Sequence, residues 1–223
     1  MIRRAAMACA ALVGVASAAA APFDRVTIDA PGELIITQGE AESVRIEAEP
    51  SVRPRLRAEV VNGALVIGAR SSLQSDRPIR FHVTLRRLAQ LHANGSAQVS
   101  IGALRTPALS LQLRGSTTAL VRELHAARLD AALDGASVLQ VQRGAVQRQA
   151  IALDDAATYD APSLHSEEAQ VTVHGSAHAR LHAARRLDAQ ASGSSRIAYA
   201  GAPRITHRLA DAAELAAAPL EKP

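Results

Sequence analysis

The second half of this chain carries a residue pattern with a fixed period. A glycine recurs at an interval of about 20 residues, aspartate replaces it once, and the last interval is slightly shorter; the series is Gly95, Gly115, Gly135, Asp155, Gly175 and Gly193. A period of this length, held over several units, is typical of repeat architectures in which each unit packs only on its neighbours. No other feature of the sequence restricts the possible folds as strongly.

Each position of the series lies between two runs of alternating apolar residues. Around Gly115, the apolar positions are Leu111 and Leu113 before the glycine and Ala119 and Val121 after it. Alternation with a period of two predicts two short strands per unit, each with one buried face. An antiparallel sandwich of hairpins would also alternate, but it does not require glycine at the same place in every unit. The pattern therefore predicts an all-β fold, a right-handed parallel β-solenoid with about 20 residues per coil.

The regular coils extend over residues 91–205, and the flanking segments differ from them. Residues 22–90 lack the fixed period but contain strand-like runs, and Asn62-Gly63 lies between two of these runs, which is a strong hairpin signal. We therefore expect an N-terminal β meander that is continuous with the solenoid and covers its first edge. The last segment, residues 206–223, is rich in alanine, and we expect a tail with one helical turn or none.

Residues 1–21 have the layout of a secretory signal peptide. Arg3 and Arg4 precede an apolar stretch that ends in small residues. A membrane anchor would need about 20 strongly apolar residues, and this alanine-rich stretch is shorter and weaker. We expect export, with cleavage after Ala18, Ala20 or Ala21.

Cleavage would remove Cys9, the chain's one cysteine, and would leave a mature protein without disulfides or thiol chemistry. It would also lower the formal net charge from +4 to +2, because Arg3 and Arg4 leave with the leader. The remaining basic residues are scattered and form no run, so we expect no nucleic-acid partner. No second apolar stretch is long enough to cross a membrane.

Several segments in a fixed order resemble the head GIN domain family, whose members are described as putative autotransporter adhesins. These segments are the opening "FDRVTIDAPGELIITQGEAESVRIEAE", the "NGALVI" hairpin, the corners "NGSA", "RGST", "HGSA" and "SGSS", and the closing "IAYAGAP". The resemblance covers about residues 23–205. It implies an all-β, solenoid-like fold in a protein of the bacterial envelope. Asp155, in a glycine position, departs from the pattern.

The Gly-Ser pairs of the corners could suggest a nucleophilic serine or an anion-binding loop. A nucleophile elbow needs G-x-S-x-G followed by a helix, and a phosphate-binding loop needs G-x-x-x-x-G-K; no corner has either pattern. We interpret each glycine as a left-handed corner, followed by a small residue such as Ser116 that packs against neighbouring coils.

The residues just before the corners stack from coil to coil. Their order predicts solvated ion pairs between Arg114 and Asp134 and between Asp154 and His174. A functional alternative is that Asp134, Asp154 and Asp155 bind Ca²⁺, or that two of these carboxylates serve a retaining glycosidase.

Three histidines, His174, His178 and His182, are four residues apart. The alternation directs all three outward, with a corner between the first and the others, so we expect scattered surface residues and no metal site. Tyr159 and Tyr199 fall on inward positions, so they offer no stacking platform for sugars or bases.

These observations leave three hypotheses for function. The first is an exported, non-enzymatic binding or scaffold module, an adhesin, in the periplasm or at the cell surface, with an envelope protein or polysaccharide as partner. The second is a β-helix enzyme acting on polysaccharide with acidic residues near Asp134 and Asp154. The third is a structural component that self-associates by its coil edges. We assign no catalytic, cofactor-binding or metal-binding residues and expect no cofactor.

Overall fold

The structure is a computed structural model that describes residues 18–19, 22–70, 75 and 77–218. Apart from Ala18 and Ala19, the predicted signal peptide lies outside the described residues. Within the described ranges the chain forms strands and one 3₁₀ turn, and none of it is a helix of the length and apolarity that crossing a membrane requires. The predicted all-β class is confirmed.

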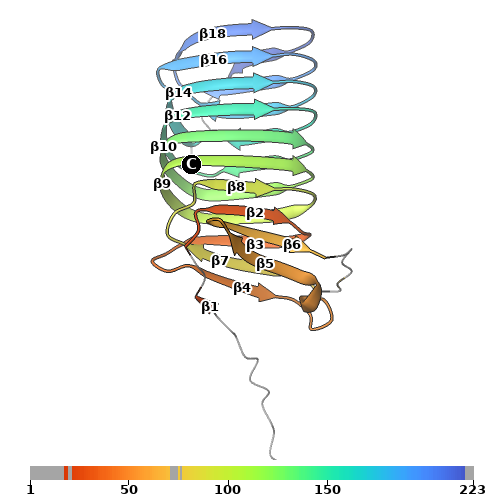
Figure 1. The fold of residues 1–223 in the computed structure, drawn as a ribbon. Helices are drawn as coiled ribbons and strands as arrows, with labels where there is room; N and C mark the ends of the chain where they lie inside the picture. The colour runs from red at the N-terminus through yellow and green to blue at the C-terminus, as the bar shows by residue number, and fades with distance from the viewer. Residues whose placement is uncertain (1–17, 20–21, 71–74, 76, 219–223) are drawn as a thin grey trace, which may run out of the picture.

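The strands stack into a prism in which each coil lies on the previous one (Figure 1). In chain order they are β1 (Ala18–Ala19), β2 (Arg25–Asp29), β3 (Gly32–Gln38), β4 (Ser43–Glu47), β5 (Leu56–Val61), β6 (Ala64–Ala69), β7 (Arg80–Leu85), β8 (Gln90–Ala93), β9 (Ala97–Gly115), β10 (Thr118–Gly135), β11 (Val138–Val141), β12 (Gly144–Leu153), β13 (Thr158–Ala161), β14 (Leu164–Val173), β15 (His178–His182), β16 (Arg186–Ala191), β17 (Arg196–Ala200), β18 (Arg204–Leu209) and β19 (Glu214–Ala217), with the 3₁₀ turn Arg53–Arg55 between β4 and β5.

Neighbouring coils pair in parallel, and the register offset equals the period of the sequence, as between Thr118 and Gln98 and between Leu133 and Leu113. Each coil has a strand segment before the corner, which contributes to a sheet we call face A, and one after it, which contributes to face B. A third segment forms face C in the first four coils, at residues 103–106, 123–126, 144–146 and 164–166. The predicted parallel solenoid, with one sequence period per coil, is confirmed.

The corner residues have the left-handed backbone that the repeat predicted. Gly115 has a φ of +83°, and an added Cβ there would come within 2.7 Å of the Gly95 carbonyl oxygen. Asp155 adopts a φ of +61° in the same position. The Ala156 amide above its corner is 3.0 Å from the carbonyl below, compared with 2.7 Å for the Ser116 amide. Above Asp155 the Ser176 amide donates to its carbonyl at 2.6 Å, so aspartate keeps the corner stacked where it replaces glycine.

The small residue that packs inside each corner is the second after the glycine, and the interpretation of Ser116 was wrong. Ser116 is exposed, whereas Thr117 is completely buried and donates a hydrogen bond from its hydroxyl to the Arg114 carbonyl at 3.0 Å. The cause is the geometry of the turn: the residue beside the left-handed position faces solvent, and the chain points inward again one residue later.

After Gly175 the repeat becomes shorter and face C ends, so we call the coils before this point long coils and those after it short coils. Strand β17 pairs with β15 at the shorter offset, as between Arg196 and His178, and β18 pairs with β16 at the same offset. In the first short coil the chain passes from His182 to Arg186 without a third strand segment. The two missing residues therefore shorten this side of the prism, although the Ala184 and Arg185 amides still donate to the Ser166 and Glu167 carbonyls at 2.9 Å.

The N-terminal strands are interleaved with the solenoid instead of forming a simple meander. β2 pairs in parallel with both β6 and β8, and β3 pairs in parallel with both β7 and β9. Three pairings in this part are antiparallel: β4 with β7, β5 with β6, and the short β1 with β4. The predicted hairpin joins β5 to β6, with Asn62 and Gly63 at φ of +50° and +73°. The sequence obscures these coils because long connections separate strands that pair.

The predicted tail is another coil. β18 and β19 pair in parallel with β16 and β17, and Asp211, one short coil after Gly193, has a φ of +60°. Because aspartate stands in the glycine position, the glycine series does not reveal this corner. The Asp211 carboxylate accepts a hydrogen bond from the Gly193 amide at 3.0 Å.

Candidate binding surface

The acidic residues proposed for calcium or glycoside chemistry do not converge. Asp134, Asp154 and Asp155 are all exposed at corners of successive coils. The described residues contain no group of three or more His, Cys, Asp or Glu side chains placed to hold a metal ion. Arg114 and Asp134 lie in register as expected, but these two described side chains form no ion pair within 4.0 Å. Both are in water, where such a pair gains little.

The three spaced histidines do not share one environment. His174 and His178 are exposed as predicted, and His174 Nδ1 lies 2.7 Å from Ser192 Oγ instead of contacting Asp154. His182 is only 9% exposed, so its predicted outward position was wrong. It ends β15 where face C is missing, and the chain turns its side chain against the ring of His165, with ring centroids 4.7 Å apart.

A polar network fills the interior beside His182. Gln149 Nε2 donates to the His182 carbonyl at 3.0 Å and lies 2.8 Å from Ser166 Oγ, and the Ser166 hydroxyl donates to the same carbonyl at 2.5 Å. The Tyr159 hydroxyl donates to Gln149 Oε1 at 2.7 Å. Burial raises the pKa of Tyr159, so its hydroxyl stays protonated and can donate. The network satisfies a carbonyl that the short coil turns inward.

Burial and the adjacent His165 lower the pKa of His182, whose Nδ1 is buried and has no hydrogen-bond partner among the described residues. His182 borders a hollow of about 490 Å³ at the end of face C, which runs past Ala145 to His125. Close to His125, hydrogen bonds from Arg143 and His125 lower the pKa of Glu123. The hollow thus combines imidazole rings with an apolar floor, without a converging set of acids.

Face A carries two adjoining hollows on its outer surface. One, of about 310 Å³, is floored by small residues including Ala132 and Ala152 and bordered by Gln112, Asp130 and Thr172. The second, of about 220 Å³, is lined mainly by charged side chains. They share Ala150 and Gln170, so they form one depression across several coils.

Ion pairs hold the charged side chains along this depression. Arg128 pairs with Asp130 at 2.6 Å, Arg186 with Asp188 at 2.9 Å, and Arg148 with Glu168 on the next coil at 3.3 Å. Positive and negative groups therefore alternate along the edge, and amides, hydroxyls and small side chains line the centre. This arrangement suits a polar, extended partner better than a strongly charged one.

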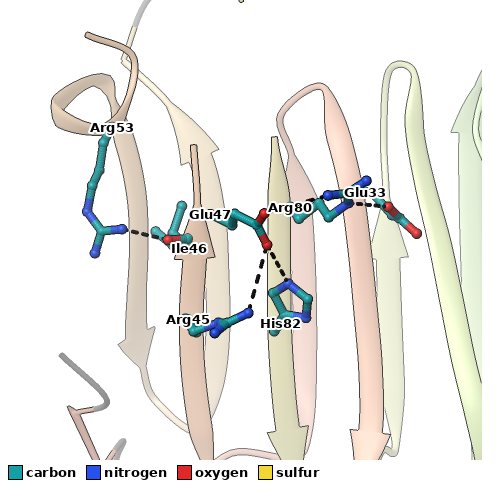
Figure 2. Close-up of polar contacts among 7 residues, drawn as sticks. All are labelled: Glu33, Arg45, Ile46, Glu47, Arg53, Arg80 and His82. Atoms are coloured by element: carbon teal, nitrogen blue, oxygen red, sulfur yellow. Dashed lines mark hydrogen bonds and ion pairs between the residues drawn. The ribbon is translucent and has the colours of Figure 1, made fainter. Parts of the chain in front are cut away.

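Another exposed polar cluster lies at the N-terminal end of face B (Figure 2). The Glu47 carboxylate on β4 faces Arg80 at 3.6 Å and His82 at 3.3 Å, both on β7, and Arg80 reaches Glu33 on β3 at 3.1 Å. Arg45 lies at 3.8 Å from the same carboxylate. These contacts tie the antiparallel strand β4 to the parallel strands beside it.

Sequence reasoning did not single out Gln149 or Ser166. Gln149 interrupts an inward column whose other members in register are Leu109, Leu129, Ala169 and Leu187. The sequence signal for Gln149 is therefore a polar residue in an otherwise apolar column, two coils before the period shortens. It marks the level at which the interior needs hydrogen-bonding groups.

Comparison with known proteins agrees with this architecture. The chain matches solved structures of a putative adhesin from Bacteroides fragilis NCTC 9343 (16% identity, 93% of this chain and 97% of that chain, TM-score 0.78) and of a putative lipid binding protein from Parabacteroides distasonis ATCC 8503 (18% identity, 92% and 96%, TM-score 0.76). It also matches a putative adhesin from Parabacteroides merdae ATCC 43184 (15% identity, 92% and 96%, TM-score 0.74). At such identities the likeness establishes the fold alone.

No curated protein matches the sequence significantly. The family model described as "Putative auto-transporter adhesin, head GIN domain" matches residues 22–203, which is well over half of the chain. Together with the corners and coils described above, this match shows that the protein belongs to the head GIN domain family.

Proposed function

We propose that this protein is an exported, non-enzymatic module of the cell envelope that binds an envelope macromolecule, a protein or a polysaccharide, through face A. The depression on that face carries the proposal. It places Gln112 and Asp130 on one side of an alanine floor and Gln170 and Thr172 on the other, on parallel strands about 4.8 Å apart, and so offers an extended partner hydrogen bonds on both sides of an apolar strip.

The family supports this function. Its description as an adhesin is consistent with a binding role at the envelope or cell surface. The name of one structural neighbour, a putative lipid binding protein, also describes binding. Asp134 and Asp154 lie on successive coils, but both are exposed at corners and neither lines the hollows of face A, so they do not favour the polysaccharide-acting enzyme as an alternative.

Export is tested by the N-terminus of the native protein. The arginines and small residues of positions 1–21 support cleavage, and mass spectrometry should find a new N-terminus between Ala19 and Pro22. An intact Met1 or a lipid on Cys9 would contradict export by this route.

Binding through face A is tested by cross-linking in intact envelopes, followed by fractionation and identification of the captured partner. Ala152→Arg places a long charged side chain in the depression and should greatly reduce capture. Ala103→Arg is the matched control, because Ala103 is also exposed but lies on face C. Equal capture by both variants would overturn the assignment of face A.

The absence of catalysis is tested separately. Purified protein incubated with a panel of envelope polysaccharides, with and without Ca²⁺, should release no product. Turnover that Asp154→Ala abolishes would replace the binding proposal with the enzyme hypothesis.

A further inference from the structure

The two ends of the solenoid are finished differently. At the N-terminal end, β4 and β5 turn antiparallel to the strands they join, and Val52, Leu56 and Ile79 cover the core with exposures of 4%, 9% and 6%. At the other end, β18 and β19 have no further strand pairing with them among the described residues. The core is therefore covered at the first end, although β5 keeps an unpaired outer edge among the described residues, and the other end presents the backbone edges of β18 and β19 (Figure 1).

The open end also exposes side chains of the inward columns. Ile205 and Leu209 are 38% and 39% exposed, although the residues below them in register, Leu187 and Ala191, are 0% and 4% exposed. Leu215, above the buried Ile197, is partly exposed. Terminal repeats of solenoids normally present polar residues at such an end. These apolar side chains continue buried columns and would become buried if another strand covered them.

We propose that the open end, formed by β18 and β19, pairs with the same end of a second copy of this chain. At the N-terminal end the exposed apolar side chains, Val61 and Val66, lie on outward positions of the β5–β6 hairpin, whereas the inward residues Val52, Leu56 and Ile79 are buried. A head-to-tail stack is therefore disfavoured. Joining the two open ends about a two-fold axis makes the facing strands antiparallel and closes the assembly at two copies.

Charge selects which strands face each other. β18 carries Arg204 and Arg208 on its outer side, and β19 carries Glu214, whose carboxylate accepts a hydrogen bond from Arg196 on the coil below at 2.9 Å and keeps a second oxygen at the open edge. Pairing β18 with β19 of the second copy can set Arg208 opposite Glu214, and the symmetry makes this contact twice. In that register the inward residues of β18 also meet the inward residues of β19. Pairing β18 with its own copy about Thr206 would instead oppose Arg204 to Arg208, which is unfavourable.

The test is the molar mass of the purified protein in sedimentation velocity over a wide range of concentration. The wild type should form a dimer. Leu209→Glu buries a charge in the joint and should raise the dimer dissociation constant by about a hundredfold or more. Val66→Glu is the matched control, since Val66 is 42% exposed on β6 at the far end, and it should leave the dimer intact.

Charge reversal tests the register. Arg208→Glu and Glu214→Arg should each weaken the dimer, and the double variant should restore it, which a loss of folding would not do. Circular dichroism checks that each variant folds. A wild type that stays monomeric at every concentration would overturn the proposal. A dimer that Leu209→Glu does not weaken would overturn it as well.

Discussion

The long coils and the short coils share one corner but differ in the rest of their cross-section. In both regions a left-handed residue turns the chain from face A to face B, at Gly115 and Gly193 with φ of +83° and +80°. Among the described residues, only the long coils form a strand on face C. The corner is therefore the element that the repeat must keep, and the third side can be shortened by removing two residues.

The interior of the solenoid changes from apolar to polar near the point where face C stops. In the first coils the column before the corner contains leucine at 109 and 129, whereas Gln149, Tyr159 and Ser166 hydrogen-bond near the level where face C stops. The short coil directs the His182 carbonyl inward, and a buried carbonyl without a partner would be destabilising. A polar network thus makes the junction between the two regions possible.

The largest expected effect breaks the shared corner. Gly115→Val forces a β-branched residue into a left-handed backbone and places its Cβ within 2.7 Å of the Gly95 carbonyl oxygen. We expect a loss of about 2 to 4 kcal/mol in the free energy of unfolding. Gly193→Val, with a 2.5 Å approach to the Gly175 carbonyl oxygen, should cost about as much in the short coils. Chemical denaturation checks both, and a small effect at either site would mean that the corner is not the shared constraint.

A smaller loss should follow from removing the polar group of the junction. Gln149→Leu continues the leucine column but leaves the buried Tyr159 hydroxyl without its acceptor. A buried donor without an acceptor lowers the free energy of unfolding by about 1 to 3 kcal/mol. Thermal and chemical unfolding measure this loss. Greater stability in the variant would show that the network is not needed there.

The junction should also respond to pH through His182. Because burial and His165 lower its pKa in the folded state, the unfolded chain binds the proton more readily. The part of the folding stability that depends on neutral His182 is then fully present above the ordinary histidine pKa of about 6.5. It is lost as the pH falls through that value toward the folded pKa. His182→Gln should reduce this decline in unfolding measurements across the same pH range. An unchanged pH dependence would contradict the role of His182.

The smallest effects are expected at corner positions that tolerate change. Asp155→Gly should be nearly neutral or mildly stabilising, because glycine removes the Cβ at a φ of +61°. Ser116→Ala should change the free energy of unfolding by no more than about 0.5 kcal/mol, because Ser116 is exposed. Thermal melts of these variants beside Gly115→Val would separate the corner from its neighbour.

The sequence predicted the regular coils because glycine at a constant interval and apolar alternation report directly on stacking. It did not predict the coil at 204–217, where Asp211 replaces glycine, or the coils at the N-terminus, where strands that pair are separated by irregular connections. It also placed His182 outside by extending the alternation through a point where the chain changes direction. The network at Gln149 depends on contacts between coils, which the period alone does not reveal.

A double-mutant cycle on Tyr159 and Gln149 tests the junction most directly, using the free energies of unfolding of Tyr159→Phe, Gln149→Leu and the double variant. Each single change leaves one buried polar atom of the 2.7 Å hydrogen bond without its partner, whereas the double change removes both. We expect the double variant to lose less stability than the sum of the single losses, by about 1 kcal/mol or more. Losses that add within about 0.5 kcal/mol would contradict it.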